Sequence, residues 1–237
     1  MNILKPSKIK KSKSYVLYGR SGTGKTTLSA SFPGKILLID VRDDGIDSIS
    51  DMDDKIDIVS TETWDDFELT YQYLKRKKKK YSTVVIDTVT QLQLLCLEHI
   101  CNKTSVTNWG DVSRQQYGKA SNMLQSWILK FRDLPLETVF TAQDRIFNTD
   151  NEEVDSEITP AVGPRLMPSV ASFLCASCTL VGECFINHSE KKGAQYMLRV
   201  SPHSYYITKV RKPKSVELKD ITNPSYKKIQ KLFKLRS

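Results

Sequence analysis

The sequence predicts an α/β fold, with a mainly parallel β-sheet flanked by helices and a few antiparallel strands near the C-terminus. Two observations carry this prediction. Short apolar runs rich in β-branched residues alternate along the 237 residues with segments of helical periodicity, which is typical of strand–helix–strand units. A glycine-rich motif at residues 19–26 also joins the first apolar run, residues 15–18, to the first helix-like segment. In doubly wound sheets such a motif occupies this first turn.

The motif itself, GRSGTGKT, fits the pattern G-x-x-x-x-G-K-[ST] at every required position. It predicts a phosphate-binding loop whose backbone N–H groups face a chain of phosphates. Lys25 is expected to reach the β- and γ-phosphate oxygens, and the Thr26 hydroxyl to ligate Mg²⁺. The residues expected to hold the nucleotide are Gly19, Arg20, Ser21, Gly22, Thr23, Gly24, Lys25, Thr26 and Thr27.

Two further strands and a helix are predicted from a break in the pattern, apolar runs and helical spacing of apolar residues. Residues 31–34 interrupt the chain, a continuous apolar run predicts a buried strand at residues 35–40, and a further short strand is expected at residues 56–59. Thr63 is the expected N-cap of a helix with acidic residues in its first turn. Apolar residues recur along this helix at a spacing that indicates core packing: Trp64, Phe67, Tyr71 and Leu74.

A second motif ends the following strand. Residues 83–88, TVVIDT, begin with four β-branched residues. The acid that follows them, Asp87, falls at the carboxyl end of the strand, the edge where open α/β sheets bind their ligands. Asp87 is therefore expected to hold the Mg²⁺ that Thr26 also contacts, directly or through water. The alternative is that Asp87 caps the helix that follows.

The remaining elements are less regular. Helices are expected at about residues 91–101 and 117–134, with an irregular polar stretch between them, and a strand at residues 137–143. Residues 148–168 are rich in acids and prolines without periodicity, which predicts a mobile loop. The final strands are expected at residues 179–181, 196–200 and 205–208.

The formal net charge of +9 is unevenly distributed. Residues 40–68 are strongly acidic, and basic residues concentrate at residues 5–13, in the unbroken run 75–80 and from residue 209 onward. Such clusters are typical of proteins that bind a polyanion, nucleic acid above all. A solvated surface is the alternative for each cluster taken alone.

Length favours one domain, for which we expect a core at residues 14–212 between a basic N-terminal segment, residues 1–13, and a basic C-terminal tail, residues 213–237. The N-terminal segment has no apolar stretch of the secretory kind, and no run approaches the roughly 18 apolar residues of a membrane span. We therefore expect a cytoplasmic protein with no membrane partner. Its five irregularly spaced cysteines are expected to be reduced thiols.

Together these motifs resemble the RecA/RadA recombinase core, and most closely the compact phage ATPases of that superfamily, which take part in recombination and single-strand annealing. The resemblance spans roughly residues 14–212 and is carried by residues 18–27, 84–88 and 139–145. It implies a RecA-like P-loop ATPase with ATP and Mg²⁺ as cofactors and single-stranded DNA as a partner. A phage-encoded protein of this kind would act in the host cytoplasm, together with partners such as a single-strand-binding protein.

The resemblance also implies roles for residues beyond the two nucleotide motifs. Residues 139–145, VFTAQDR, look like the strand that in RecA proteins ends in a glutamine sensing the γ-phosphate and opens the second DNA-binding loop. Gln143 is therefore the sensor candidate, and residues 146–168 are the loop candidate. The alternative is a glutamine that merely finishes a strand.

Residues 207–211, ITKVR, are similar to the strand from which RecA-family proteins project two basic residues into a neighbouring subunit's nucleotide. Lys209 and Arg211 are two residues apart and so share one face of a strand. Cations there would stabilise the charge on the transferring phosphoryl group in trans. This role implies a homo-oligomer, either a ring or a filament, whereas the alternative assigns both residues to the basic tail.

One position departs from the family pattern. RecA-like enzymes carry a glutamate that polarises the attacking water in a segment of the form I-D-x-E, and Arg42 occupies that place here. Asp43 or Asp44 could substitute for it after a small register shift. Because an aspartate side chain is one methylene shorter, we expect slow hydrolysis, while ATP binding is unaffected.

Four further residues have the spacing of metal ligands: Cys175, Cys178, Cys184 and His188. Apolar residues are interleaved with them, which favours burial of the cysteines in the core over a structural zinc site.

The first functional hypothesis is a DNA-stimulated ATPase of phage-type recombination, in which ATP at subunit interfaces orders a loop that grips single-stranded DNA. An oligomeric helicase or other nucleic-acid motor shares every nucleotide residue. A small-molecule kinase is disfavoured because no arginine-rich lid is visible and the basic tail suits a polymer. The departure at Arg42 motivates a fourth hypothesis, an ATP-gated binding module with little hydrolysis.

Overall fold

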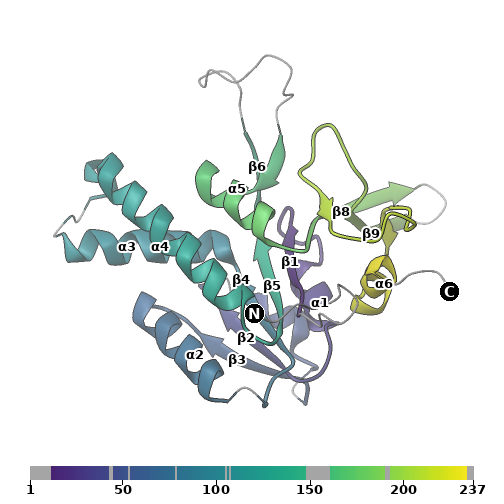
Figure 1. Cartoon of the computed structure of the whole chain (residues 1–237), viewed down its shortest axis with the longest axis horizontal. Coiled ribbons are helices and arrows are strands. Elements are labelled where there is room, and N and C mark those ends of the chain that lie inside the picture. The colour runs from purple at the N-terminus through teal and green to yellow at the C-terminus, as the bar shows by residue number, and fades with distance from the viewer. Residues whose placement is uncertain are drawn as a thin grey trace, which may run out of the picture.

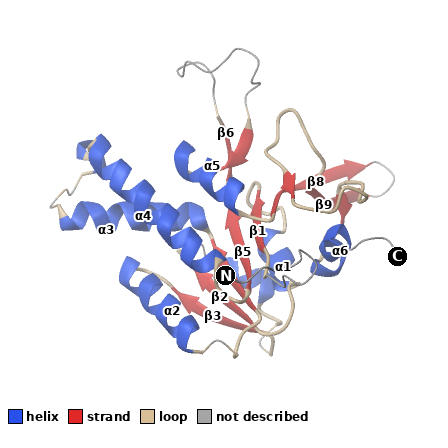
Figure 2. Cartoon of the chain, in the orientation of Figure 1, coloured by secondary structure: helices blue, strands red, loops and turns tan. Residues whose placement is uncertain are grey.

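The computed structural model describes residues 12–42, 45–52, 54–77, 79–104, 106, 108–147, 161–189 and 193–233. These residues build one nine-stranded sheet, a separate two-stranded sheet and the helices that cover them (Figures 1 and 2). The strands are β1 (Ser14–Tyr18), β2 (Ile36–Asp40), β3 (Ile56–Ser60), β4 (Thr83–Asp87), β5 (Glu137–Ala142), β6 (Asp144–Ile146), β7 (Val162–Pro164), β8 (Leu180–Ser189), β9 (Gly193–Arg199), β10 (Lys209–Val210) and β11 (Ile221–Thr222). The helices are α1 (Lys25–Ala30), α2 (Trp64–Arg76), α3 (Val89–Lys103), α4 (Arg114–Arg132), α5 (Pro168–Ser177) and α6 (Tyr226–Gln230), with 3₁₀ turns at Gly45–Ile49, Trp109–Asp111 and Lys231–Phe233.

The main sheet has the order β11-β9-β8-β1-β5-β4-β2-β3, and β10 pairs with β8. Six neighbouring strands, from β8 to β3, are parallel, whereas β9, β10 and β11 are attached antiparallel on the β8 side. The sequence prediction of a mainly parallel sheet with a few antiparallel strands near the C-terminus is confirmed. The six carboxyl ends meet at one edge, which we call the carboxyl edge.

One face of the sheet is covered by α2, α3, α4 and α5. Trp64, Phe67, Trp127 and Phe131 form an aromatic cluster there, with the rings of Phe67 and Phe131 stacked at 4.9 Å. α2 begins as the sequence predicts, because the Thr63 hydroxyl accepts from the N–H of Asp66 while the Asp66 carboxylate accepts from the N–H of Thr63. This reciprocal cap satisfies two N–H groups at the start of the helix.

The opposite face is covered by α1 and α6. The Phe32 ring packs 4.8 Å from both Tyr15 and Tyr226, and Ile229 is fully buried beside them. The Tyr226 N–H also donates to the Ser31 hydroxyl at 2.8 Å. Residues 221–233, which the sequence analysis places in a basic tail, therefore contribute a strand and a helix to this core.

Several predicted elements differ from those observed. The helix α5 was not predicted, because its sequence has little amphipathic periodicity. The strand predicted at residues 205–208 is wrong: Tyr206 forms only an isolated bridge with Val162, and the pairing with β8 occurs at β10. Of the predicted mobile loop, residues 148–160 lie outside the described residues, while β7 and the start of α5 occupy its end.

None of the helices in the described part of the chain combines the length and apolar character of a membrane-spanning segment.

Candidate functional site

The glycine-rich loop lies at the carboxyl edge, between β1 and α1. Gly19 has φ +150°, and a Cβ there would lie 2.2 Å from the carbonyl oxygen of Cys184 on the adjacent β8. Only glycine permits this approach. Gly24 caps α1 in the left-handed conformation, with φ +81°. The loop's path therefore depends on glycine at both ends of the motif.

Lys25 is folded into the loop that precedes it. Its side chain is 8% exposed, and its ammonium donates to the carbonyl oxygens of Gly19 at 2.9 Å and Arg20 at 2.7 Å. These bonds hold the positive charge inside the loop, where the motif predicts the phosphates.

Thr26 and Asp87 are in direct contact. The Thr26 hydroxyl donates to Asp87 Oδ2 at 2.7 Å, and the Thr141 hydroxyl of β5 donates to Oδ1. Asp87 is 3% exposed. A hydroxyl and a carboxylate oxygen fit a hard cation such as Mg²⁺, which takes one or two carboxylates from the protein and further ligands from water and phosphate. Thr26 and Asp87 are therefore the residues that could hold the metal.

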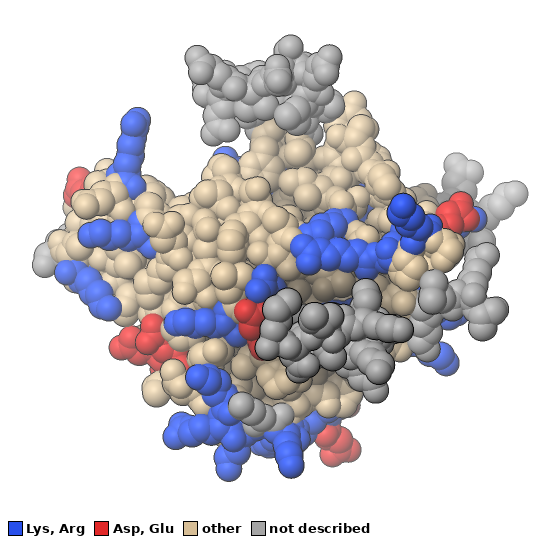
Figure 3. All heavy atoms as spheres, in the orientation of Figure 1, with Lys and Arg blue, Asp and Glu red and all other residues tan. Residues whose placement is uncertain are grey.

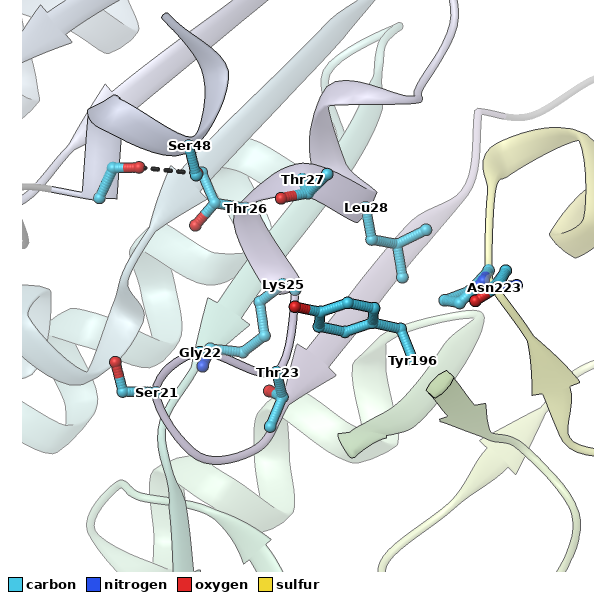
Figure 4. A pocket seen from close by; sticks show the side chains of 13 residues that line it. Ser21, Gly22, Thr23, Lys25, Thr26, Thr27, Leu28, Ser48, Tyr196 and Asn223 are labelled. Carbon is cyan, nitrogen blue, oxygen red and sulfur yellow. Dashed lines mark hydrogen bonds between the residues drawn. The ribbon is translucent and has the colours of Figure 1, made fainter. Parts of the chain in front are cut away.

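A cavity of about 640 Å³ opens along the loop and the start of α1 (Figure 4). Its opposite wall is made of Tyr196 from β9 and of Asn223 and Pro224, which follow β11. These three residues were not predicted as part of the site from the sequence. No motif marks them, because they reach the loop only through the pairing of β8, β9 and β11. The predicted nucleotide residues that line this cavity are Ser21, Gly22, Thr23, Gly24, Lys25, Thr26 and Thr27.

Gln143 follows β5 and lies in a second cavity of about 640 Å³. Its N–H donates to the Thr90 hydroxyl at 3.1 Å, and its side-chain oxygen accepts from the Arg165 guanidinium at 3.2 Å. Arg145 and Tyr117 line the same cavity. The structure thus bonds Gln143 to Arg165 and places both in one cavity with Arg145, and the role of Gln143 as a γ-phosphate sensor stays a prediction.

Arg42 forms a charged cluster with two glutamates. Its guanidinium donates to the Glu98 carboxylate at 2.8 Å and to the backbone oxygen of Glu62 at 2.5 Å, and lies 3.6 Å from the Glu62 carboxylate. Asp43 and Asp44, the proposed substitutes for the family's glutamate, lie outside the described residues. Asp40, which the sequence analysis passed over, is a buried acid opposite Asp87 in the register of β2 and β4. Its place at a strand's carboxyl end could have identified it.

Lys209 and Arg211 share one face, as predicted, but they contact α5. Lys209 donates to the carbonyl oxygens of Cys175 at 2.7 Å and Ala176 at 2.6 Å, and Arg211 donates to that of Ala176 at 2.6 Å. Burial, with a smaller contribution from Arg211, lowers the pKa of Lys209. Because β10 pairs with the beginning of β8, both cations lie toward the amino ends of the parallel strands, away from this chain's own loop. Their action on a neighbour's nucleotide stays a prediction.

Of the four residues with metal-ligand spacing, the three cysteines are divided between the two faces of the sheet, and His188 is exposed near the end of β8. Cys175 and Cys178 are buried on the α5 side, and Cys184 is buried on the α1 side. Burial raises the pKa of each of these three thiols, to about 12, 11 and 12. Among the described residues, no group of three or more potential ligands forms a metal site.

Most of the basic run at residues 75–80 can be located in the structure. On the face shown in Figure 3, Lys and Arg gather around the C-terminal end of α2. Lys80 of this run is 2.9 Å from the Asp57 carboxylate, so part of the run is paired within the chain. The chain passes from this run into the amino end of β4, which places the run opposite the carboxyl edge. Residues 5–11 of the N-terminal cluster lie outside the described residues.

A buried ion pair lies on the other side of the glycine-rich loop. Arg199 donates to the Glu183 carboxylate and covers the Tyr206 ring at 3.9 Å. A cavity of about 520 Å³ connects this pair with Arg20 of the loop. Burial raises the pKa of Glu183 to about 7, although Arg199 acts in the opposite direction.

Comparison with known proteins identifies a family. The model of a family described as "AAA domain" matches residues 11–212. No curated protein sequence matches the chain.

Three solved structures are similar to this chain. A KaiC-like protein from the hyperthermophilic archaeon Pyrococcus horikoshii is 13% identical, covers 89% of this chain with 84% of its own length, and superposes with a TM-score of 0.50. The flagellar accessory protein FlaH from Methanocaldococcus jannaschii is 9% identical, with 79% of this chain and 76% of that chain covered and a TM-score of 0.43. The RadB recombinase is 14% identical, with 78% and 80% covered and a TM-score of 0.43. The predicted α/β, RecA-like fold class is confirmed.

Proposed function

Because this chain belongs to the AAA domain family, we propose that it is a RecA-like ATPase that binds ATP and Mg²⁺ and acts on single-stranded DNA in phage-type recombination or annealing. The observation that carries the proposal is the contact between Thr26 of the glycine-rich loop and Asp87, beside a cavity that also holds Lys25. The motif supplies N–H groups and a cation for the phosphates, and the contact supplies oxygen ligands for the metal.

Bound Mg²⁺ would neutralise charge on the β- and γ-phosphates. Thr26 and Asp87 would hold it, while Thr141 fixes the orientation of the Asp87 carboxylate through its second oxygen. Lys25 would exchange its bonds to the loop carbonyls for bonds to phosphate oxygens. Asp40, buried opposite Asp87, is a second carboxyl group at this edge.

The second cavity supports the DNA-binding part of the proposal. Arg145 and Arg165 are exposed cations there, and Tyr117, 41% exposed, offers a ring on which a base can stack. Phosphate contacts and base stacking are the two sources of affinity for single strands. Arg145 and Arg165 also lie at the carboxyl edge, as the glycine-rich loop does, whereas the lysine run after α2 lies at the opposite edge. We therefore propose that single-stranded DNA binds at this second cavity.

The end of β5 connects the two cavities. Thr141 donates to Asp87, the Ala142 oxygen accepts from the N–H of Gly19, and Gln143 accepts from Arg165. Residues 141, 142 and 143 thus contact, in this order, the proposed metal-binding acid, the phosphate-binding loop and a proposed DNA-binding arginine. A shift of Asp87 on binding Mg²⁺ would be passed to Arg165 along this short path, which gives a physical basis for coupling ATP to DNA.

A second function, an ATP-gated binding module with little hydrolysis, is favoured by one observation. Arg42, at the place of the family's glutamate, is paired with Glu98 and Glu62 and supplies no carboxylate to activate water.

Phosphate release with and without single-stranded DNA separates the two functions. An ATPase releases phosphate faster when DNA is added, and Lys25→Ala abolishes the release. Tight, DNA-linked ATP binding without release supports the gated module instead. Equal DNA binding by the wild type and Lys25→Ala, with and without ATP, would disprove the coupling.

A further inference from the structure

The cavity beside the glycine-rich loop continues past the place predicted for the phosphates. It extends along α1 to Leu28 and is closed by Tyr196, Asn223 and Pro224. Figure 4 shows Tyr196 beside Lys25, with Leu28 and Asn223 on the far side of its ring. A nucleotide whose phosphates lie in the loop must place its sugar and base in some part of this space. The far wall is therefore the surface that such a base would meet.

Tyr196 is held next to the loop but its ring is not covered. A Cβ added at Gly24 would lie 3.2 Å from Tyr196 Cδ1, so the ring packs against the bare backbone of residue 24. The side chain is nevertheless 47% exposed, although it stands on a paired strand. An open aromatic face beside an expected ligand is a stacking surface.

The backbone of Asn223 has a conformation that few residues other than glycine adopt. Its φ is +46°, in the left-handed region, and its N–H donates to the Tyr196 carbonyl at 2.7 Å. Lys228 donates to the carbonyl oxygens of Thr222 at 2.7 Å and Asn223 at 2.9 Å. The backbone at Asn223 is thus tied to Tyr196 on one side and to Lys228 on the other. Asn223 itself is exposed and lines the cavity.

We propose that Tyr196 and Asn223 form a base-recognition site that stacks the nucleotide's purine and selects adenine. This inference rests on the proposed function, because it requires the phosphates to lie in the loop. An asparagine amide can donate to N7 and accept from the N6 amino group of adenine. Guanine presents two acceptors, N7 and O6, on the same edge, so the amide oxygen would face a second oxygen. The described residues that line the cavity include no carboxylate that could accept from guanine's N1–H and N2 amino groups.

The proposal is tested by titrating the full chain with three probes: MgATP, MgGTP and magnesium tripolyphosphate, which has no base. Tyr196→Ala removes the stacking surface, and Tyr196→Phe keeps it. Asn223→Gly removes the amide but tolerates the positive φ, so that the turn is preserved. Tyr205→Ala, another half-exposed tyrosine outside the cavity, is the matched control. Melting temperatures confirm that each variant is folded.

We expect Tyr196→Ala to weaken MgATP binding by roughly tenfold and to leave tripolyphosphate binding unchanged. Tyr196→Phe and Tyr205→Ala are expected to bind MgATP as the wild type does. Asn223→Gly is expected to reduce the preference for ATP over GTP by about tenfold.

Three results would overturn the base-recognition site while leaving the phosphate site in place. They are unchanged MgATP binding by Tyr196→Ala, an equal loss of MgATP and tripolyphosphate binding, and an undiminished ATP preference in Asn223→Gly. If the wild type bound neither MgATP nor tripolyphosphate, the proposed function and this inference would both be wrong.

Discussion

The Thr26 hydroxyl donates a hydrogen bond of 2.7 Å to Oδ2 of Asp87, a residue 61 positions further along the chain. Thr26 ends the glycine-rich motif and Asp87 ends β4, and the sequence predicts that both residues hold one Mg²⁺ ion. They meet because β1 and β4 are both neighbours of β5 and run parallel, so that their carboxyl ends lie at the same edge. The contact is the structural basis for the expectations that follow.

Replacing Asp87 by asparagine keeps the size of the side chain but removes its charge. We expect Asp87→Asn to lose the gain in ATP affinity that Mg²⁺ provides, since the cation then lacks its carboxylate ligand. ATP binding in the presence of a chelator should be unaffected. Calorimetry with and without Mg²⁺ measures both values, with the exposed Asp111→Asn as control. A full Mg²⁺ effect in Asp87→Asn would show that the metal binds elsewhere.

Lys25→Ala removes the cation held inside the loop. Loss of one group that stabilises developing charge costs about 10²- to 10³-fold in rate, so phosphate release should fall by at least that factor. The exposed Lys119→Ala on α4 should release phosphate at the wild-type rate. A Lys25→Ala protein that hydrolyses ATP normally would exclude the loop from catalysis.

Glu183 makes stability depend on pH. Its pKa is raised from 4.5 to about 7 in the folded protein, so between these values the folded state retains a proton that the unfolded state has lost. Stability therefore falls as pH rises from about 4.5 to 7, by at most about 3 kcal/mol. Urea denaturation at pH 5 and pH 7 should show this loss in the wild type but not in Glu183→Gln. Identical pH dependence of the two proteins would mean that Glu183 titrates normally.

The C-terminal segment should be necessary for stability. Ile229 of α6 is fully buried, and its truncation to alanine leaves a cavity beside Phe32, so we expect Ile229→Ala to cost about 2–5 kcal/mol. The neighbouring Lys227 is exposed, and Lys227→Ala should cost little. Chemical denaturation compares the two variants. Equal stability of Ile229→Ala and the wild type would mean that α6 does not pack on the core in solution.

The assignment of the DNA strand to the second cavity predicts a particular salt dependence. Arg145→Ala and Arg165→Ala should each weaken binding of single-stranded DNA and reduce the slope of log affinity against log salt by about 0.7. Arg76→Ala, in the basic cluster at the end of α2, should do neither. If only Arg76→Ala changed the slope, the strand would bind at the opposite edge of the sheet.

Most of the parallel sheet could be predicted from the sequence, because its buried strands are short apolar runs and its amphipathic helices have clear periodicity. The contact between Thr26 and Asp87 could also be anticipated, since both residues end motifs at the same edge. For these elements the local sequence pattern was enough to predict their place in the sheet.

The rest depended on contacts that no local pattern records. α5 has little amphipathic periodicity, so the sequence pattern could not distinguish it from loop or strand. Tyr196 and Asn223 reach the glycine-rich loop because β11 pairs antiparallel with β9. The lysines of α6 made its segment resemble a solvated tail. The predicted burial of Cys175, Cys178 and Cys184 in the core is confirmed, but their spacing did not show that Cys184 lies on the other face of the sheet from the first two.

A crystal structure of the full chain with Mg²⁺ and a non-hydrolysable ATP analogue tests the central claim most directly. We expect the triphosphate to lie in the loop of residues 19–26, with Lys25 at its β- and γ-oxygens and the metal about 2.1 Å from the Thr26 hydroxyl oxygen. Asp87 should contact the metal directly or through one water. A triphosphate bound outside the loop, with the hydrogen bond between Thr26 and Asp87 still in place, would contradict the account.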